Sequence, residues 1–283
     1  MTTKLNLIVN SRATMNNKKN TCRLCGGKLS FKFNLQILKK YDISYFEFIH
    51  CYSLQAEEPY WLDEAYKQNI SNLDTGAVQR NLNNFAICYT FAKIFNVNRA
   101  IDFGSSDGLL CRFLRDHMID AYCTDKYSVP KYAQNFTLPP TNNIDLITGF
   151  EVLEHLSDPN SDLDEIFSYD PKYFLCSTEL YISQDENWWY LSKESGQHVF
   201  FYTAEAINFI ADKYGYSVTK IGDMLLFYKS DIINIKEMIA SANTCLTGWV
   251  FKAIKSFIFN LHADGIDNDY YLIKNKLSND LNN

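Results

Sequence analysis

Apolar runs and amphipathic segments alternate through the middle of this chain. From about Thr75 to Phe95, apolar residues recur at intervals of three and four, which predicts an amphipathic helix. Further along, the pattern predicts strands at 99–103, 121–124, 144–149 and 173–177 and helices at 109–117, 163–169 and 203–214. Strands that alternate with helices imply parallel βαβ units, so we expect a doubly wound α/β fold with helices on both faces of the sheet.

The last two apolar runs of this region follow a different pattern. Residues 217–221 and 224–228 are separated only by Gly222 and Asp223. Two residues can connect only an antiparallel pair of strands. We therefore expect a mostly parallel sheet that ends in an antiparallel hairpin.

The same pattern divides the chain into four predicted segments. Residues 1–20 are polar, rich in Asn and Lys, and predict a flexible tail. Residues 21–70 are rich in aromatic side chains, contain a Gly26-Gly27 turn signal, and predict a small module with cysteines. Residues 71–230 are the predicted α/β domain. Residues 231–283 predict a helical extension, with apolar periodicity at 232–242, 249–261 and 270–277.

Composition narrows the class of protein. With 283 residues, 47% of them hydrophobic, the chain can bury a full core. The net charge of −6 gives no field that attracts a polyanion, so nucleic acid is not a favoured partner. No apolar run reaches the roughly 18 residues of a membrane-spanning helix, and the first residues lack the apolar stretch of a secretion signal. We expect a soluble, cytoplasmic protein whose partner is a small molecule or a glycan.

The eight cysteines fall into two groups. Five stand alone in apolar or mixed segments, where cysteine acts as a small hydrophobe: Cys88, Cys111, Cys123, Cys176 and Cys245. Cys22 and Cys25 have the spacing of half a zinc knuckle, but Phe48 stands at the third ligand position, ahead of Cys51. Two interpretations stay open: a zinc ion on Cys22, Cys25 and Cys51, or a module without zinc that its aromatic core holds together.

Residues 100–110 carry the sharpest signal for a ligand. A buried strand runs into a turn with Gly104 and Gly108 and then into a helix, and these glycines let the backbone approach a cofactor closely. Asp107 would repel a dinucleotide pyrophosphate at the start of that helix. S-adenosylmethionine carries a sulfonium and an ammonium but no phosphate, so it suits Asp102 and Asp107. Ser106 stands where G-x-G-x-x-G would have its second glycine.

A second carboxylate follows the next strand. Asp125 ends the run 121–124. At that position a carboxylate can accept hydrogen bonds from both ribose hydroxyls of an adenosine cofactor. The alternative is a residue that caps a turn.

These motifs together resemble those of the class I S-adenosylmethionine methyltransferases. Asp102-Phe103-Gly104-x-x-x-Gly108, Asp125, and then Glu151-Val152-Leu153-Glu154-His155-Leu156 match that family in order and spacing over about residues 75–230. The resemblance implies a Rossmann-like fold with a seven-stranded sheet, and methyl transfer from S-adenosylmethionine. It also implies a set of cofactor-binding residues: Asp102, Gly104, Ser106, Asp107, Gly108, Asp125 and Phe150.

The segment after the fourth strand carries candidate metal ligands. If a helix begins there, Glu151, Glu154 and His155 project from one face and suit magnesium, manganese or zinc. His198 precedes an aromatic run in the crossover after the fifth strand. The pattern resembles the metal-binding set of small-RNA 2′-O-methyltransferases and ubiquinone-pathway O-methyltransferases, which implies Glu151, Glu154, His155 and His198 as ligands. The alternative is a metal-free, hydrogen-bonded cluster in which His155, His198 or Glu151 acts as the general base.

The substrate is the least defined feature. The cysteine segment and residues 55–66 resemble methyltransferases encoded with bacterial surface-polysaccharide and sugar-biosynthesis genes, which implies a sugar hydroxyl as acceptor. Some aromatic residues suit stacking on a sugar ring, although packing is the commoner role: Tyr60, Trp61, Trp188, Trp189 and Tyr190. Two other functions remain: a C-methyltransferase or quinone-type O-methyltransferase, and a non-catalytic adaptor, against which the intact cofactor motifs argue. The sequence does not set the oligomeric state.

Overall fold

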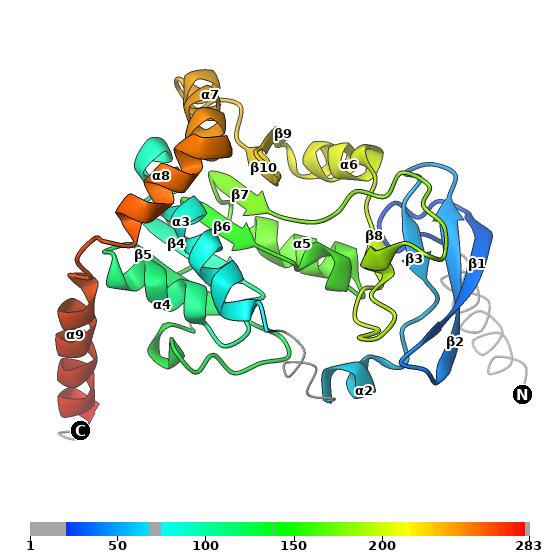
Figure 1. Cartoon of the computed structure of the whole chain (residues 1–283), viewed down its shortest axis with the longest axis horizontal. Helices are drawn as coiled ribbons and strands as arrows, with labels where there is room; N and C mark the ends of the chain where they lie inside the picture. Colours follow the sequence, from blue (N-terminus) through cyan, green and yellow to red (C-terminus); the bar gives the residue numbers. More distant parts are fainter. Residues whose placement is uncertain (1–20, 68–74, 138, 281–283) are drawn as a thin grey trace, which may run out of the picture. The chain divides into compact units, whose positions relative to one another are not determined.

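The computed structural model describes residues 21–67, 75–137 and 139–280 of the chain, and it separates into two compact units (Figure 1). The first unit contains the described residues before 71 together with Leu153–Asp164 and Thr178–Tyr214. The second unit contains the remaining described residues. The expected tail at 1–20 lies outside the described residues. The units differ from the predicted boundaries, because two segments of the predicted 71–230 domain pack with the N-terminal module.

The second unit is built on a mostly parallel sheet. Its strand order is β5-β4-β6-β7-β10-β9. The first four of these strands run parallel, whereas β10 is antiparallel to both β7 and β9. The strands are β4 (Arg99–Phe103), β5 (Asp120–Thr124), β6 (Leu146–Gly149), β7 (Tyr173–Cys176), β9 (Ser217–Ile221) and β10 (Met224–Tyr228). The doubly wound α/β fold and the closing hairpin are confirmed.

The expected seventh strand is not found among the described residues. The segment between β5 and β6 contains a short 3-10 helix, Gln134–Phe136, instead of a strand. Pro130, Pro139 and Pro140 lie in this segment. Proline has no amide hydrogen to donate to a strand ladder, which accounts for the missing strand.

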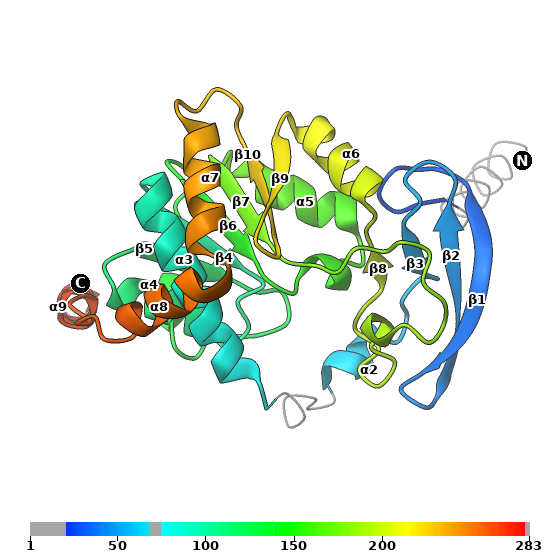
Figure 2. The ribbon, with the colours of Figure 1, turned by 45° about the horizontal axis from the view of Figure 1, so that its top comes forward.

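Helices cover this sheet. The expected helix before β4 is confirmed as α3, and Phe91 and Phe95 on it stack at 3.9 Å with Tyr173 of β7 at their edges. In Figure 2, α8 lies across α3, against which α7 also packs. The helices of this unit are α3 (Ala77–Phe95), α4 (Leu109–Asp116), α7 (Ile235–Cys245), α8 (Gly248–Ile258) and α9 (Gly265–Asp280).

The helix α9 is held against α4 by ion pairs. Asp269 on α9 accepts hydrogen bonds from Arg112 and from both Arg115 Nε and Nη2, all between 2.6 and 2.8 Å. Arg115 is buried, and its guanidinium lies 3.5 Å from the centre of the Phe136 ring. A buried arginine is costly unless it is paired, so Asp269 stabilises the position of α9 against α4.

The first unit contains a separate antiparallel sheet of order β1-β2-β3-β8. Its fourth strand comes from residues 200–201, so the cysteine module is larger than the predicted 21–70. Its elements are β1 (Leu29–Ile37), β2 (Tyr41–Phe48), β3 (Leu54–Ala56), β8 (Phe200–Phe201), α2 (Leu62–Lys67), α6 (Ala204–Tyr214), and 3-10 turns η3 (Leu153–His155) and η4 (Trp189–Leu191). The helix α5 (Pro159–Ser168) begins in this unit. In the described part of the chain no helix is long and apolar enough to cross a membrane.

Candidate active site

The predicted cofactor loop joins the ends of two neighbouring strands in the second unit. The amides of Gly104 and Ser105, which follow β4, both donate hydrogen bonds to the carbonyl oxygen of Thr124 at the end of β5. Gly104, Ser106 and Gly108 all have positive φ, between 50° and 77°. The loop therefore turns sharply at the carboxyl edge of the sheet, where open α/β folds bind ligands.

Both glycines are required by the packing of the chain itself. A Cβ at position 104 would lie 2.5 Å from Val152 Cγ2, and one at position 108 would lie 2.9 Å from Pro130 Cβ. Their positive φ angles add backbone strain for any other residue. On sequence alone, these two glycines were explained by close approach of a cofactor. The structure adds a second reason, the close packing of Val152 and Pro130.

Asp102 is a buried carboxylate beside the loop. Its Oδ1 accepts a hydrogen bond of 2.9 Å from Thr148 Oγ1 on the paired strand β6. The pKa of Asp102 is raised to about 7, because the effect of burial, with a smaller one from the negative charge of Asp125, outweighs the lowering by the Thr148 hydrogen bond. A carboxylate in this environment is stabilised by a nearby positive charge.

Asp125 holds the loop in its turn. Its Oδ2 accepts a hydrogen bond of 2.8 Å from the Ser106 amide, and its Oδ1 accepts bonds from the amides of Tyr127 and Ser128. The turn-forming role is therefore present. A carboxylate has about four acceptor positions, so capacity remains for a ribose hydroxyl as well.

The other predicted cofactor residues lie around this loop. Asp107 forms an ion pair of 3.2 Å with Lys131, and both side chains are exposed. Phe150, after β6, packs against the hydrophobic core of the unit. With carboxylates at 102, 107 and 125, the loop fits a cationic cofactor such as S-adenosylmethionine better than a pyrophosphate.

Glu151 does not join the other predicted metal ligands in the first unit. Its φ is +53°, and the following turn η3 covers only Leu153–His155, so the expected helix face at 151, 154 and 155 is wrong. The Glu151 amide donates to Ser177 Oγ at 3.0 Å, and that hydroxyl donates back to Glu151 Oε1 at 2.8 Å. Ser177 was not among the predicted site residues.

Three of the four predicted ligands come together within the first unit. Potential ligand atoms of Glu154, His155 and His198 all lie within 4.8 Å of one another. Glu154 is fully buried, and its Oε1 lies 4.0 Å from His155 Nε2. The two imidazole rings pack edge to face at 4.7 Å. We call this group the histidine cluster.

Both imidazoles of the histidine cluster are neutral near pH 7. Nδ1 of His198 lies 2.7 Å from the carbonyl oxygen of Tyr190, and we assign it as the protonated nitrogen, which leaves Nε2 with a lone pair. Burial lowers the pKa of His198 to about 4. Burial, and then the proximity of His198, lower the pKa of His155 to about 3. A neutral ring nitrogen can accept a proton or bind a divalent cation.

Tyrosines complete the surroundings of these histidines. Tyr66 Oη lies 3.4 Å from His155 Nδ1, and the Tyr190 ring packs edge to face on His198 at 4.7 Å. One buried carboxylate and two neutral imidazoles fit manganese or zinc, and they suit magnesium less well. On sequence alone, Tyr66 had no role of its own, although Tyr66 ends the stretch 55–66 that resembles sugar-biosynthesis methyltransferases.

The three N-terminal cysteines also form a cluster in the first unit. Cys51 Sγ lies 3.7 Å from Cys22 Sγ and 3.3 Å from Cys25 Sγ, and all eight cysteines are free thiols. The amides of Leu24 and Cys25 donate to Cys22 Sγ. A hydrogen bond from Cys22 lowers the pKa of Cys51 to about 5.

The third ligand position of a zinc knuckle, which Phe48 occupies in this chain, is used for packing. Phe48 is buried and stacks on Phe200 of β8. Three sulfur donors within reach of one another fit a zinc ion that completes its tetrahedron with another ligand.

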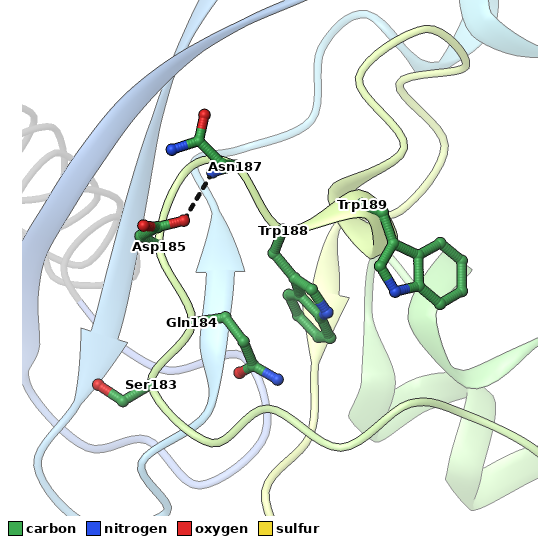
Figure 3. Close-up of a pocket in the computed structure, with 6 residues that line it drawn as sticks. All are labelled: Ser183, Gln184, Asp185, Asn187, Trp188 and Trp189. Atoms are coloured by element: carbon green, nitrogen blue, oxygen red, sulfur yellow. Dashed lines mark hydrogen bonds between the residues drawn. The ribbon is translucent and has the colours of Figure 1, made fainter.

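The aromatic residues proposed for sugar stacking divide into two groups. Trp61 and Tyr190 are 1% and 2% exposed, and the Trp61 indole donates to the carbonyl oxygen of Gly196, so both belong to the core. Trp189 is 73% exposed. It borders an open hollow of about 570 Å³ whose other lining residues are Ser183, Gln184, Asp185, Asn187 and Trp188 (Figure 3).

Residues 74–221 match the family described as "Methyltransferase domain". No curated protein sequence matches the chain.

Among solved structures, the methyltransferase domain of bacterial CtHen1-C is 20% identical, with 53% of this chain and 98% of that chain covered and a TM-score of 0.39. Magnesium protoporphyrin IX methyltransferase from Synechocystis PCC 6803 is 14% identical, with 61% and 98% covered and a TM-score of 0.41. Mitomycin 7-O-methyltransferase is 12% identical, with 58% of each chain covered and a TM-score of 0.43. These likenesses are distant.

Proposed function

Because this chain belongs to the methyltransferase domain family and is an S-adenosylmethionine-dependent methyltransferase, we propose that it methylates a hydroxyl group of a sugar, a nucleotide sugar or a glycan. The observation that carries this proposal is the histidine cluster. Two neutral imidazoles beside a buried carboxylate are equipped to take a proton from a hydroxyl. The family match covers the cofactor loop from β4 to β5.

On the donor side, the carboxylates of the cofactor loop bind S-adenosylmethionine. Asp102 balances the positive charge of the cofactor, and Asp125 accepts hydrogen bonds from the ribose. The positive-φ turn at Gly104 and Gly108 exposes backbone at the sheet edge. The sulfonium is already a good leaving group, so the remaining task of the enzyme is to align the acceptor and remove its proton.

On the acceptor side, His198 is the general base. Its Nδ1 donates to the Tyr190 carbonyl, which fixes the ring and leaves Nε2 as the proton acceptor. His155 lies 4.7 Å away between ring centres and stays uncharged beside it. Glu154, fully buried, stabilises the positive charge that a protonated imidazole acquires.

Metal ions are a finer part of this proposal. As the alternative to His198 as base, Glu154, His155 and His198 would hold a divalent cation, Mn²⁺ more readily than Mg²⁺, and His198 Nε2 would then be a ligand. Such an ion, when bound, lowers the pKa of a hydroxyl placed on it. Cys22, Cys25 and Cys51 would hold a structural zinc. Metal analysis of the purified protein tests both, with the triple variant Cys22→Ser, Cys25→Ser, Cys51→Ser and the double variant His155→Ala, His198→Ala as references.

A sugar acceptor is supported by the surface around Trp189. Its indole face is exposed, and polar side chains line the adjoining hollow. An aromatic face beside hydrogen-bonding groups is suited to a sugar ring. This proposal places the chain in polysaccharide biosynthesis. The alternative is a phenol or quinol acceptor, for which Tyr66 and Tyr190 next to the histidines provide aromatic contact.

The deciding experiment is an acceptor panel. Purified enzyme with S-adenosylmethionine is incubated with nucleotide sugars, free glycans, catechols, a quinol and a carbon acid, and formation of S-adenosylhomocysteine is measured. We expect turnover with a sugar compound and its loss in His198→Ala. Turnover only with a quinol would replace the sugar by the phenolic alternative, and turnover only with the carbon acid would contradict O-methylation altogether.

A further inference from the structure

We propose that Arg23, inside the Cys22-Arg23-Leu24-Cys25 motif, is a positioning residue that holds the backbone beside His198. The inference rests on the proposed function for its catalytic consequence. Its structural basis lies entirely in the first unit. Through Arg23, the N-terminal cysteine module would help to position His198, a role that a zinc knuckle alone does not imply.

The contact that matters joins Arg23 to the residue after His198. Arg23 Nη2 donates a hydrogen bond of 2.8 Å to the carbonyl oxygen of Val199, across 176 positions of sequence. Nη1 reaches the carbonyl oxygen of Glu57 at 3.5 Å. Val199 is fully buried, so water does not replace this contact easily.

Val199 is held from its other side by the histidine cluster. Its amide donates a hydrogen bond of 2.8 Å to the carbonyl oxygen of Glu154. The residue after His198 is therefore held at both polar groups: its carbonyl accepts from Arg23 and, at 3.0 Å, from the Ala56 amide, and its amide donates to Glu154. Loss of Arg23 would remove the one side-chain donor to the Val199 carbonyl and leave this backbone with the Ala56 and Glu154 contacts of Val199 and the ring contact of His198 with Tyr190.

Arg23 can do this because its own backbone is anchored. Its amide donates to Gln55 Oε1 at 3.2 Å, and Asn160 Nδ2 donates to the carbonyl oxygens of Arg23 and Leu24 at 2.7 and 3.1 Å. Cys22 and Cys25 flank it and bring the same loop to Cys51. The cysteine cluster is thus the base from which the guanidinium reaches Val199.

An arginine suits this position better than a lysine. The planar guanidinium presents several donors in a fixed fork and can serve two carbonyl groups at once. A lysine keeps the charge but offers a single point of contact on a flexible stem. We therefore expect Arg23→Lys to retain part of the function and Arg23→Met to lose it.

The test compares wild type, Arg23→Met, Arg23→Lys and the control Arg112→Met, which removes an ion-paired arginine of the second unit. Hydrogen exchange of peptides covering residues 195–203 and the ¹⁵N shifts of the His198 ring report local order without any turnover. S-adenosylmethionine affinity, Mn²⁺ affinity, kcat and KM are measured alongside.

For Arg23→Met we expect at least tenfold faster exchange at the Val199 amide and a changed tautomer ratio at His198. We expect kcat to fall at least tenfold while S-adenosylmethionine affinity stays within twofold. Arg23→Lys should lie between Arg23→Met and wild type, and Arg112→Met should leave the 195–203 peptides and His198 unchanged.

Exchange rates and His198 shifts in Arg23→Met that match wild type would overturn the inference. A wild-type protein that shows neither turnover nor Mn²⁺ binding would contradict the proposed function, while the exchange and tautomer measurements would still decide the role of Arg23. An equal disturbance in Arg112→Met would show a general loss of stability and would also overturn it.

Discussion

The cofactor loop and the histidine cluster are built in opposite ways. The loop uses residues that are close in sequence, from Asp102 to Asp125, and its shape comes from positive-φ glycines and backbone hydrogen bonds at the edge of one sheet. The histidine cluster, with Tyr66 beside it, comes from three separated stretches, and it is held by the contact of Tyr66 with His155 and of His198 with the Tyr190 carbonyl. A local site can be recognised from a motif, whereas an assembled site becomes visible only once the chain is folded.

The largest expected effect tests the assembled site. His198→Ala should lower kcat by about 10²- to 10⁴-fold, the usual contribution of a general base, while S-adenosylmethionine affinity stays within about twofold. Steady-state kinetics and calorimetry measure the two quantities. His262→Ala, which removes an exposed histidine paired with Asp264, is the matched control and should change neither. Unchanged turnover in His198→Ala would remove this residue from the mechanism.

The next effect tests the local site. Gly104→Ala combines a left-handed φ with a methyl group 2.5 Å from Val152 Cγ2. We expect a loss of about 2–5 kcal/mol of stability, from overpacking and backbone strain together. Gly215→Ala has a similar φ of +76° but no neighbour within 4 Å of the new Cβ, so it isolates the strain term of about 1–2 kcal/mol. Equal costs in chemical unfolding would show that contact with Val152 contributes nothing.

A smaller effect follows from the pKa of Asp102, raised to about 7 by burial. Binding of the cationic cofactor requires the ionised carboxylate, so affinity should rise by up to about tenfold per pH unit below pH 7 and level off above it. In the free protein the sign is reversed: the folded state binds more protons between about pH 4 and 7, so the free energy of unfolding falls as pH rises through that window. Asp102→Asn should flatten both profiles, measured by calorimetry and denaturant unfolding. A pH-independent affinity in wild type would contradict the role of Asp102.

The smallest effect concerns the exposed ion pair at the loop. Lys131→Met removes the partner of Asp107. Exposed pairs contribute at most about 1 kcal/mol, so stability should hardly change, and S-adenosylmethionine affinity should improve by less than about threefold because one positive charge is lost near the loop. Affinity that falls instead would show that Lys131 itself contacts the cofactor.

Much of the fold was readable from the sequence because its signals are local. The alternation of apolar runs located every strand of the parallel sheet, and Gly222-Asp223 located the hairpin. A seventh strand was implied only by the family resemblance, and the segment before β6, with Pro139 and Pro140, contains no strand among its described residues. The two units were not readable, because β8 leaves the predicted α/β domain and pairs with β3, and no local pattern records a partner that distant.

The candidate site was predictable to a similar degree. The glycines and carboxylates of the loop were identified, although their contacts with Val152, Pro130 and the Ser106 amide were not. The spacing of Glu151, Glu154 and His155 predicted one helix face, and the left-handed backbone at Glu151 makes that wrong. Arg23 carried no chemical signal of its own in the sequence, because its importance depends on a carbonyl group 176 residues away.

The pairing of Asp269 with Arg112 and Arg115 makes the end of the chain a source of counter-ions for the helix that follows the cofactor loop. A protease that cuts near Asp264 would remove the Asp269 charge and leave the Arg115 guanidinium, which lies against the Phe136 ring, with Asp120 as its remaining carboxylate partner. Loss of α9 would then change the charge around α4, the helix that follows the cofactor loop. An intact α9 is therefore a sensible check on any preparation used to measure cofactor affinity.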